Sequence, residues 1–149
     1  MNISSILSPN GVILSLRSCS KKPIFEELAQ KSSEVYGHLA SDIFDVLIDR
    51  EKLGSTVLGN GVAIPHGKIE KINKISIIFA RSQYPIEFDT IDKYLVDLFC
   101  MLIVPKESGS EDFKAISCIS RILRNETLCR QLRHANSVHT IYDLLTKKL

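Results

Sequence analysis

The sequence predicts an α/β fold: a single domain, residues 1–149, with a β-sheet flanked by helices on both faces. Three observations support this fold class. An almost continuous apolar run, 94–104, is typical of a central strand that is covered on both sides. Segments with helical apolar spacing precede and follow the strands, so helices are available to cover both faces of a sheet. A chain of 149 residues is also long enough to bury a sizeable core.

The individual elements follow from apolar spacing and from the capping or turn residues at their ends. A turn is expected at 8–11, Ser-Pro-Asn-Gly. Apolar and β-branched runs predict strands at three places: 12–16, 74–80 and 94–104. Apolar residues three or four positions apart, bounded by Ser or Gly, predict helices at five places: 20–37, 41–54, 111–123, 128–132 and 137–145. The buried side of the third helix is expected to include Phe113, Ile116 and Ile119.

Composition and charge exclude several classes of function. The net charge is +2, with nineteen basic and seventeen acidic residues dispersed along the chain, whereas nucleic-acid-binding domains carry a clustered basic surface. We therefore expect no nucleic-acid partner. The amino terminus lacks the pattern of a signal peptide, and no apolar stretch approaches the ~20 residues that span a bilayer, which predicts a cytoplasmic protein without direct membrane insertion. The four cysteines form no C-x-x-C pair and the histidines lack metal-ligand spacing, so we expect reduced thiols, no metal and no cofactor.

Residues 50–68 contain four of the seven glycines and the best candidate for a reactive side chain, His66. The Gly59–Gly61 segment, Gly-Asn-Gly, favours a type I′ hairpin turn that would lead into a short strand presenting His66. Pro65 restricts the backbone before the histidine. Gly67 is expected to leave one side of the imidazole uncrowded. His66 should therefore be both positioned and open to approach.

A histidine held in this way can carry a phosphoryl group. The neutral imidazole is a nucleophile near pH 7, but it needs an open ring nitrogen, an acceptor that fixes its tautomer, and donors for the phosphoryl oxygens. Arg50, in the last turn of the preceding helix, could supply a planar fork of N–H groups, and Ser55 and Thr56 could add hydroxyls. Plainer interpretations stay open, because loop histidines are commonly surface or packing residues and Arg50 also complements its helix dipole.

The motif Arg-Glu-Lys-Leu-Gly-Ser-Thr (50–56), followed by Gly-Asn-Gly-Val-Ala-Ile-Pro-His-Gly-Lys (59–68), resembles the signature of the type-2 enzyme IIA domain of the bacterial phosphotransferase system. It is most similar to the fructose/mannitol and nitrogen-regulatory branch. Further similar segments are 85–89, 96–99 with Val104-Pro105, and 128–132. The resemblance implies a mixed sheet flanked by helices on both sides. It also implies that His66 accepts a phosphoryl group from phospho-HPr and that Arg50 binds the phosphoryl oxygens.

The chain departs from the family pattern at Asp112. The family usually has a second histidine here, at the start of the helix after Val-Pro, where it faces the phosphorylated one. A carboxylate could repel the phosphoryl group, or could hydrogen-bond the imidazole N–H of His66 and raise its nucleophilicity. Asp112 could also simply complement its helix amino terminus. A milder departure is Leu95, where relatives often have proline.

Three functions remain compatible with the sequence. The first is a standalone regulatory phosphocarrier whose two forms bind different targets. The second is a sugar-uptake carrier that passes its phosphoryl group to a IIB domain, and the third is a binding module in which Asp112 has abolished phosphorylation. The chain contains no IIB or membrane segment, which favours the first. The expected partners are a phospho-HPr-like carrier and a regulated target or IIB domain, docked around the histidine by four residues: Lys52, Leu58, Lys68 and Phe113.

Overall fold

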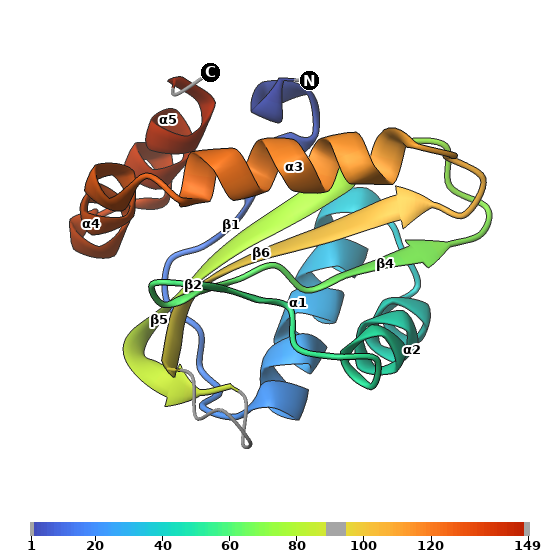
Figure 1. Cartoon of the computed structure of the whole chain (residues 1–149), viewed down its shortest axis with the longest axis horizontal. Helices are drawn as coiled ribbons and strands as arrows, with labels where there is room; N and C mark the ends of the chain where they lie inside the picture. The colour runs from blue at the N-terminus through green and yellow to red at the C-terminus, as the bar shows by residue number, and fades with distance from the viewer. Residues whose placement is uncertain (1, 89–94, 148–149) are drawn as a thin grey trace.

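A β-sheet separates two helical layers in the computed structural model, which describes residues 2–88 and 95–147 (Figure 1). Helices α1 (Lys21–Tyr36) and α2 (Ala40–Glu51) cover one face of the sheet. The other face is covered by three helices: α3 (Glu111–Leu123), α4 (Glu126–His134) and α5 (Val138–Lys147). A short 3-10 helix, η1 (Ile3–Ser5), precedes six strands: β1 (Leu7–Ile13), β2 (Val57–Gly59), β3 (Val62–Ala63), β4 (His66–Ile69), β5 (Ser76–Glu87) and β6 (Leu95–Pro105). The predicted α/β fold is confirmed.

Strand β6 lies in the centre of the sheet, as its apolar run predicted. It pairs antiparallel with β5 on one side and parallel with β3 and β4 on the other, while β1 runs parallel to β5, so the sheet is mixed. Every residue of 98–103 is at most 3% exposed. Leu98 and Leu102 enter the core under α3 to α5, whereas Phe99 and Ile103 enter the core under α1 and α2. Both layers are needed to cover this strand.

Strands β3 and β4 follow one another along the same side of β6; β3 is covered on its other side by β2, whereas β4 lies at the edge of the sheet. Val62 and Ala63 pair with 98–99, and His66–Ile69 pair with 102–105, so the interruption falls at 64–65. Proline at this point is compatible with an edge strand because it donates no ladder hydrogen bond. His66 therefore begins a strand at the edge of the sheet, where both helical layers can reach it. This agrees with the predicted short strand that presents the histidine.

The hairpin between β2 and β3 has the predicted type I′ geometry. Asn60 and Gly61 have φ angles of 53° and 81°, and positive φ at both central residues defines this turn. Arg133 of α4 donates two hydrogen bonds to the carboxylate of Asp97 in β6, with Nε–Oδ2 and Nη2–Oδ1 distances of 2.8 and 2.9 Å. Its Nη2 also donates to the Asn60 carbonyl in the turn, at 2.6 Å. A Cβ on Gly61 would lie 2.6 Å from Nη2 of Arg133, so this glycine is required for space as well as for φ.

Several element boundaries differ from the predictions. The expected turn at 8–11 lies inside β1, which pairs at Leu7 and again at Val12 and bulges between them. The Tyr36 hydroxyl accepts the Ser8 N–H in this bulge at 2.9 Å, so the backbone group stays paired. Strand β5 runs to Glu87, well beyond the predicted end at residue 80, because its polar second half still pairs with β6. Asp89 and Tyr94, which belong to segments named above, lie outside the described residues.

The ends of the second helix also differ from the predicted bounds, 41–54. This helix, α2, begins at Ala40, with Leu39 and not Ser41 as its N-cap, and it ends at Glu51. Tight three-residue turns then continue the chain, with the Leu53 N–H bonded to the Arg50 carbonyl and the Gly54 N–H bonded to the Glu51 carbonyl. Gly54 therefore follows this extension and does not cap the helix directly. Its φ of 145° still requires glycine.

The prediction that Phe113 is buried in α3 is wrong: its side chain is 72% exposed. The buried face of α3 includes Asp112, Ala115 and Ile119. Neighbouring helix residues point about 100° apart, so burying Asp112 turns Phe113 towards solvent. The apolar pattern predicts that the face with Phe113 is the buried one, because carboxylates such as that of Asp112 are rarely buried unless they are paired.

The four cysteines are free thiols, and three of them are buried as predicted: Cys100, Cys118 and Cys129. Burial raises the pKa of the Cys100 thiol to about 12, so it stays protonated at neutral pH. Across residues 2–88 and 95–147, none of the helices combines the length and the apolar character of a membrane span.

Gly67 has a different role from the one expected. A Cβ at this position would lie 2.6 Å from Cγ2 of Val46 and 2.9 Å from its Cβ. The glycine therefore lets β4 approach α2 closely, and the neighbouring side chain that it avoids is Val46 rather than the imidazole of His66. This close approach brings the end of α2 up to the edge of the sheet.

We expect Gly67→Ala to lower the free energy of unfolding by about 1–3 kcal/mol, because the added methyl overpacks the β4–α2 contact. Chemical denaturation measures the loss. The single change Val46→Ala should lower the free energy of unfolding, but in the Gly67→Ala background it should restore part of the free energy that Gly67→Ala loses. Simple additivity of the two single changes would show that Val46 is not the obstacle.

Candidate functional site

Two hydrogen bonds hold the imidazole of His66. Its Nδ1 lies 2.8 Å from the carbonyl oxygen of Ile64, and its Nε2 lies 3.2 Å from Nε of Arg50. A carbonyl oxygen only accepts, so Nδ1 carries the proton and donates it to Ile64. Nε2 is then unprotonated and accepts from the arginine. The structure thus assigns the tautomer and leaves the Nε2 lone pair facing the guanidinium.

The break between β3 and β4 creates this arrangement. The Pro65 carbonyl accepts the Leu102 N–H at 2.9 Å and so returns the chain to the sheet at His66. The Ile64 carbonyl, which lies just before the proline, is left for the ring of His66. Pro65 favours the extended conformation of Ile64 that makes this local contact possible. The sequence prediction of a positioned histidine is supported by these contacts.

Arg50 reaches His66 from the last turn of α2. Its Nη1 donates to the Gly54 carbonyl at 2.9 Å while its Nε donates to Nε2 of His66. These two bonds hold the planar group across the histidine nitrogen. Arg50 thus lies beside the histidine, while its predicted role of binding phosphoryl oxygens stays a prediction, in addition to any effect of Arg50 on the helix dipole.

The pKa of His66 is lowered from its ordinary value. Burial has the largest effect and lowers the pKa, because the charged ring loses water. The Ile64 hydrogen bond raises it, Arg50 lowers it, and the carboxylates of Glu51 and Asp112 raise it, with a net decrease. The lowered pKa disfavours the imidazolium and so favours the neutral, nucleophilic ring at neutral pH.

We expect Arg50→Met to raise the pKa of His66, because the change removes a positive charge that disfavours the imidazolium. A pH titration of the ring signals by NMR measures the midpoint. His38 is an internal control, since burial lowers its pKa and Arg50 has no part in that shift. A lower or unchanged His66 midpoint in the variant would contradict the assigned geometry.

Glu51 was missed by sequence reasoning. Its side chain is 6% exposed, and Oε2 lies 3.1 Å from Nζ of Lys21. The Thr56 hydroxyl donates to its Oε1. Thr56 is 8% exposed and its hydroxyl is committed to this carboxylate, so the structure does not direct it to His66. The Ser55 hydroxyl is exposed and accepts the Val57 N–H at 3.2 Å.

Asp112 contacts Lys68 rather than His66. Its Oδ2 lies 3.1 Å from Nζ of Lys68, and its Oδ1 accepts the Phe113 N–H at 2.8 Å. The N–H of the His66 ring is already bound to Ile64, so the hydrogen bond considered between Asp112 and His66 is not formed. The helix-terminus interpretation of Asp112 is the one that the contacts support, with Lys68 as an additional partner.

Burial would raise the pKa of Asp112, but the hydrogen bonds and charge of Lys68 and the Phe113 N–H together lower it. Asp112 is therefore an anion at neutral pH. Its charge is felt at His66, where it raises the imidazole pKa. Asp112 thus lies near the candidate site without touching the ring.

The residues expected at a docking surface differ in how exposed their side chains are. Lys52 is exposed, and its Nζ lies 3.6 Å from Oδ1 of Asp49. Leu58 is only partly exposed and packs on the core under α3 to α5, so it is a weaker candidate than predicted. Phe113 is well exposed, and so is Leu53, which is 84% exposed and directly follows Lys52. Sequence reasoning missed Leu53, although its place after the last helical turn was a signal of exposure.

The fold and site define an α/β domain whose sheet edge presents a neutral histidine, with its free nitrogen against an arginine. The chain belongs to the family described as "Phosphoenolpyruvate-dependent sugar phosphotransferase system, EIIA 2", whose sequence profile matches residues 5–148. The predicted family resemblance is confirmed.

Relatives place the chain near nitrogen-regulatory members of this family. It is 40% identical over 145 residues to a nitrogen regulatory protein of Bradyrhizobium diazoefficiens, which covers 97% of this chain and 95% of that relative. The crystal structure of nitrogen regulatory protein IIA-Ntr from Neisseria meningitidis matches with a TM-score of 0.87 and 32% identity, over 95% of this chain and 97% of that one. These findings support a phosphocarrier or regulatory role within the phosphotransferase system.

A more distant structure shows the breadth of the fold. The mannitol enzyme IIA of Escherichia coli, solved in complex with phosphorylated enzyme IIB, matches with a TM-score of 0.78 over 95% of this chain and 99% of that one. The identity is 18%, so this likeness supports the fold alone.

Proposed function

We propose that the protein is a regulatory phosphocarrier that accepts a phosphoryl group on Nε2 of His66 from a phosphohistidine carrier of the HPr type. One observation carries the proposal. Nδ1 donates its proton to the Ile64 carbonyl, which leaves the Nε2 lone pair as the nucleophile and places Arg50 beside it. The lowered pKa of His66 keeps this lone pair available at neutral pH.

The transfer step balances without a proton leaving the site. The Nε2 lone pair forms the new N–P bond while the bond between phosphorus and the donor ring nitrogen breaks, and its electron pair returns to the donor. His66 then carries the phosphoryl group on Nε2 and a proton on Nδ1. The Ile64 carbonyl stabilises the resulting positive ring through the existing hydrogen bond. The donor, protonated on its other nitrogen, leaves as neutral imidazole.

Arg50 must turn from Nε2 to the incoming phosphoryl oxygens during this step. Its bond to the Gly54 carbonyl keeps the guanidinium at the site while the bond to His66 breaks. Phosphoryl transfer requires little covalent help from a protein, so the rate depends on positioning and on charge stabilisation. A planar, permanently charged guanidinium suits both requirements.

Regulation would follow from the change in surface charge. A phosphoryl group adds about −1.5 to −2 charges near pH 7. Exposed side chains adjoin the site residues in the chain: Lys52 and Leu53 follow Arg50, and Phe113 follows Asp112. Such apolar and basic groups suit a small and transient docking surface. The nitrogen-regulatory names of the relatives support a regulatory output over sugar uptake.

Intact-mass spectrometry at alkaline pH tests the proposal. The protein is mixed with enzyme I, HPr and phosphoenolpyruvate, and one acid-labile phosphoryl adduct is expected. The absence of an adduct, with HPr shown to be phosphorylated, would instead favour a binding module that does not carry phosphate.

A sugar-uptake carrier is the second candidate, because the description of the matching family names a sugar phosphotransferase system. Incubation of the phosphorylated protein with an isolated IIB domain distinguishes the two. Rapid transfer to IIB would support uptake, whereas retention of the phosphoryl group would support regulation.

A further inference from the structure

Lys68 lies on the same side of β4 as His66. Side chains alternate along a strand, so His66 and Lys68 face one side while Gly67, between them, faces Val46 of α2. The partners of β4 give the same assignment, since His66 and Lys68 pair with Leu102 and Val104, whose side chains belong to the core under α3. Lys68 thus approaches the histidine from the α3 layer, opposite to Arg50 on α2.

The ion pair between Lys68 and Asp112 is unequal. The Asp112 side chain is 12% exposed and is held by the Phe113 N–H as well as by Lys68, whereas the Lys68 side chain is 47% exposed. An ammonium group has three donors on a flexible four-carbon stem, and one bond to Asp112 leaves donors free. Lys68 can therefore turn towards the sheet edge while Asp112 stays in place.

We propose that Lys68 is a second phosphoryl-binding residue and that Asp112 keeps its ammonium beside His66 until the phosphoryl group arrives. This inference rests on the proposed phosphorylation of His66. A phosphoryl group on Nε2 would lie between Arg50 from the α2 side and Lys68 from the α3 side. Its double negative charge and three acceptor oxygens attract the ammonium more strongly than one carboxylate does.

This arrangement also accounts for the acidic residue at the place where the family usually has a second histidine. A bare carboxylate near a phosphoryl dianion would be repulsive. In the proposed phosphorylated state the ammonium of Lys68 turns to the phosphoryl oxygens, and Asp112, its partner at 3.1 Å in the structure, serves as the counter-charge. The departure at Asp112 is then compatible with a working carrier.

The test uses Lys68→Met, which keeps the stem and removes the charge. The phosphorylated proteins, prepared with enzyme I, HPr and phosphoenolpyruvate, are titrated by ³¹P NMR. A neighbouring cation favours the dianionic phosphoryl group, so Lys68→Met should raise the midpoint of its ionisation. Transfer from phospho-HPr should be roughly tenfold slower. This is a smaller loss of rate than the roughly 10²–10³-fold that follows removal of a fully preorganised donor, because the Lys68 side chain is half-exposed.

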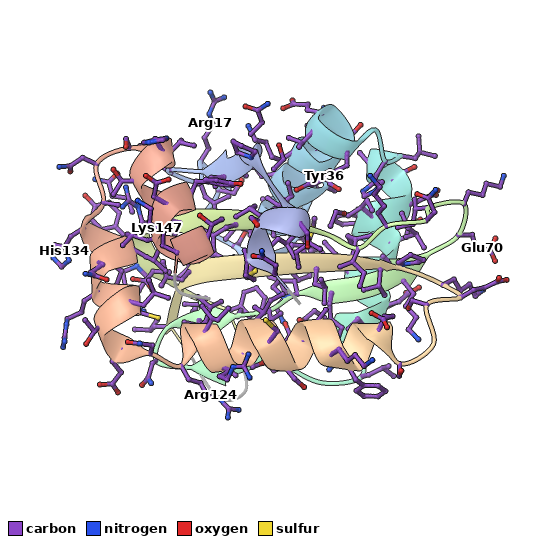
Figure 2. The ribbon with its side chains drawn as sticks, turned by 90° about the horizontal axis from the view of Figure 1, so that it is seen from above. Arg17, Tyr36, Glu70, Arg124, His134 and Lys147 are labelled. Atoms are coloured by element: carbon purple, nitrogen blue, oxygen red, sulfur yellow. The ribbon has the colours of Figure 1, made fainter. Side chains whose placement is uncertain are left out.

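Lys106→Met is the matched control. Lys106 forms an ion pair with Glu70 at the same distance, 3.1 Å, but both side chains are more than 60% exposed. Figure 2 shows Glu70 at one end of the molecule, beyond β4. This control should leave the ³¹P midpoint and the transfer rate unchanged, while Lys68→Arg should restore both towards the unmodified protein.

The outcomes separate this inference from the proposed function. If the unmodified chain takes up no phosphoryl group, both proposals are overturned. If it is phosphorylated and Lys68→Met leaves the ³¹P midpoint unchanged, or Lys106→Met shifts it equally, only the role of Lys68 is overturned.

Discussion

Replacement of His66 by alanine is expected to abolish the phosphoryl adduct while the fold remains intact. The imidazole supplies the only nucleophile that the proposed step uses, and its ring is partly exposed at the edge of the sheet, where its loss leaves no large cavity. Intact-mass spectrometry measures the adduct, and circular dichroism with thermal unfolding measures the fold. The labelling should fall to background, because the proposed step places the new N–P bond on Nε2 of His66 and the variant lacks that nitrogen.

His134→Ala is the matched control for this experiment. The Nδ1 of His134 also lies 2.8 Å from a backbone carbonyl, that of Arg130, so its tautomer is held in the same way. The residue lies at the far end of the molecule from Glu70 (Figure 2). His134→Ala should be labelled like the unmodified protein. Acid-labile phosphate that persists in His66→Ala would show that another residue is the acceptor.

Arg50→Lys is expected to slow the transfer by roughly 10²-fold, at the lower end of the loss seen when one stabilising donor is removed. The charge is retained, but an ammonium cannot reproduce the planar fork that donates to His66 and to Gly54 at the same time. Rapid-mixing measurements of transfer from phospho-HPr give the rate. The effect should appear in the rate of transfer rather than in the final extent of labelling.

Arg124→Lys is a suitable control, since Arg124 is an exposed arginine at the end of α3 (Figure 2). It should transfer at the normal rate. An unchanged rate in Arg50→Lys would mean that Arg50 only completes the end of its helix, which is the plainer interpretation of a basic residue in the last turn.

Features with a local cause could be predicted from the sequence. The type I′ turn at 59–61 depends on two neighbouring residues that tolerate positive φ, and these are visible in the letters Asn-Gly. The central position of β6 follows from a run too apolar to face water on either side. The placement of His66 after Pro65 is likewise local, because its anchoring carbonyl lies two residues away.

Features that depend on the packing of distant segments could not be predicted. The local sequence predicts that Gly67 leaves room for the imidazole, because the side chain it avoids, Val46, belongs to a helix distant in the sequence. The apolar pattern of α3 predicts a buried Phe113, because it does not indicate that a carboxylate occupies the buried position. The burial of Glu51 is not visible in its own helix, because its partners, Lys21 and Thr56, lie outside α2.

The sequence by itself determined the fold class, the histidine and the arginine expected to act with it, since these depend on periodicity and on one continuous motif. Only the tertiary structure decided that Arg50 lies against Nε2 of His66 and which cation lies beside Asp112, because each contact joins side chains from different elements. The physical reason is that burial of a charge is favourable only when an opposite charge reaches it. For Asp112 that charge is Lys68, which β4 brings to the start of α3.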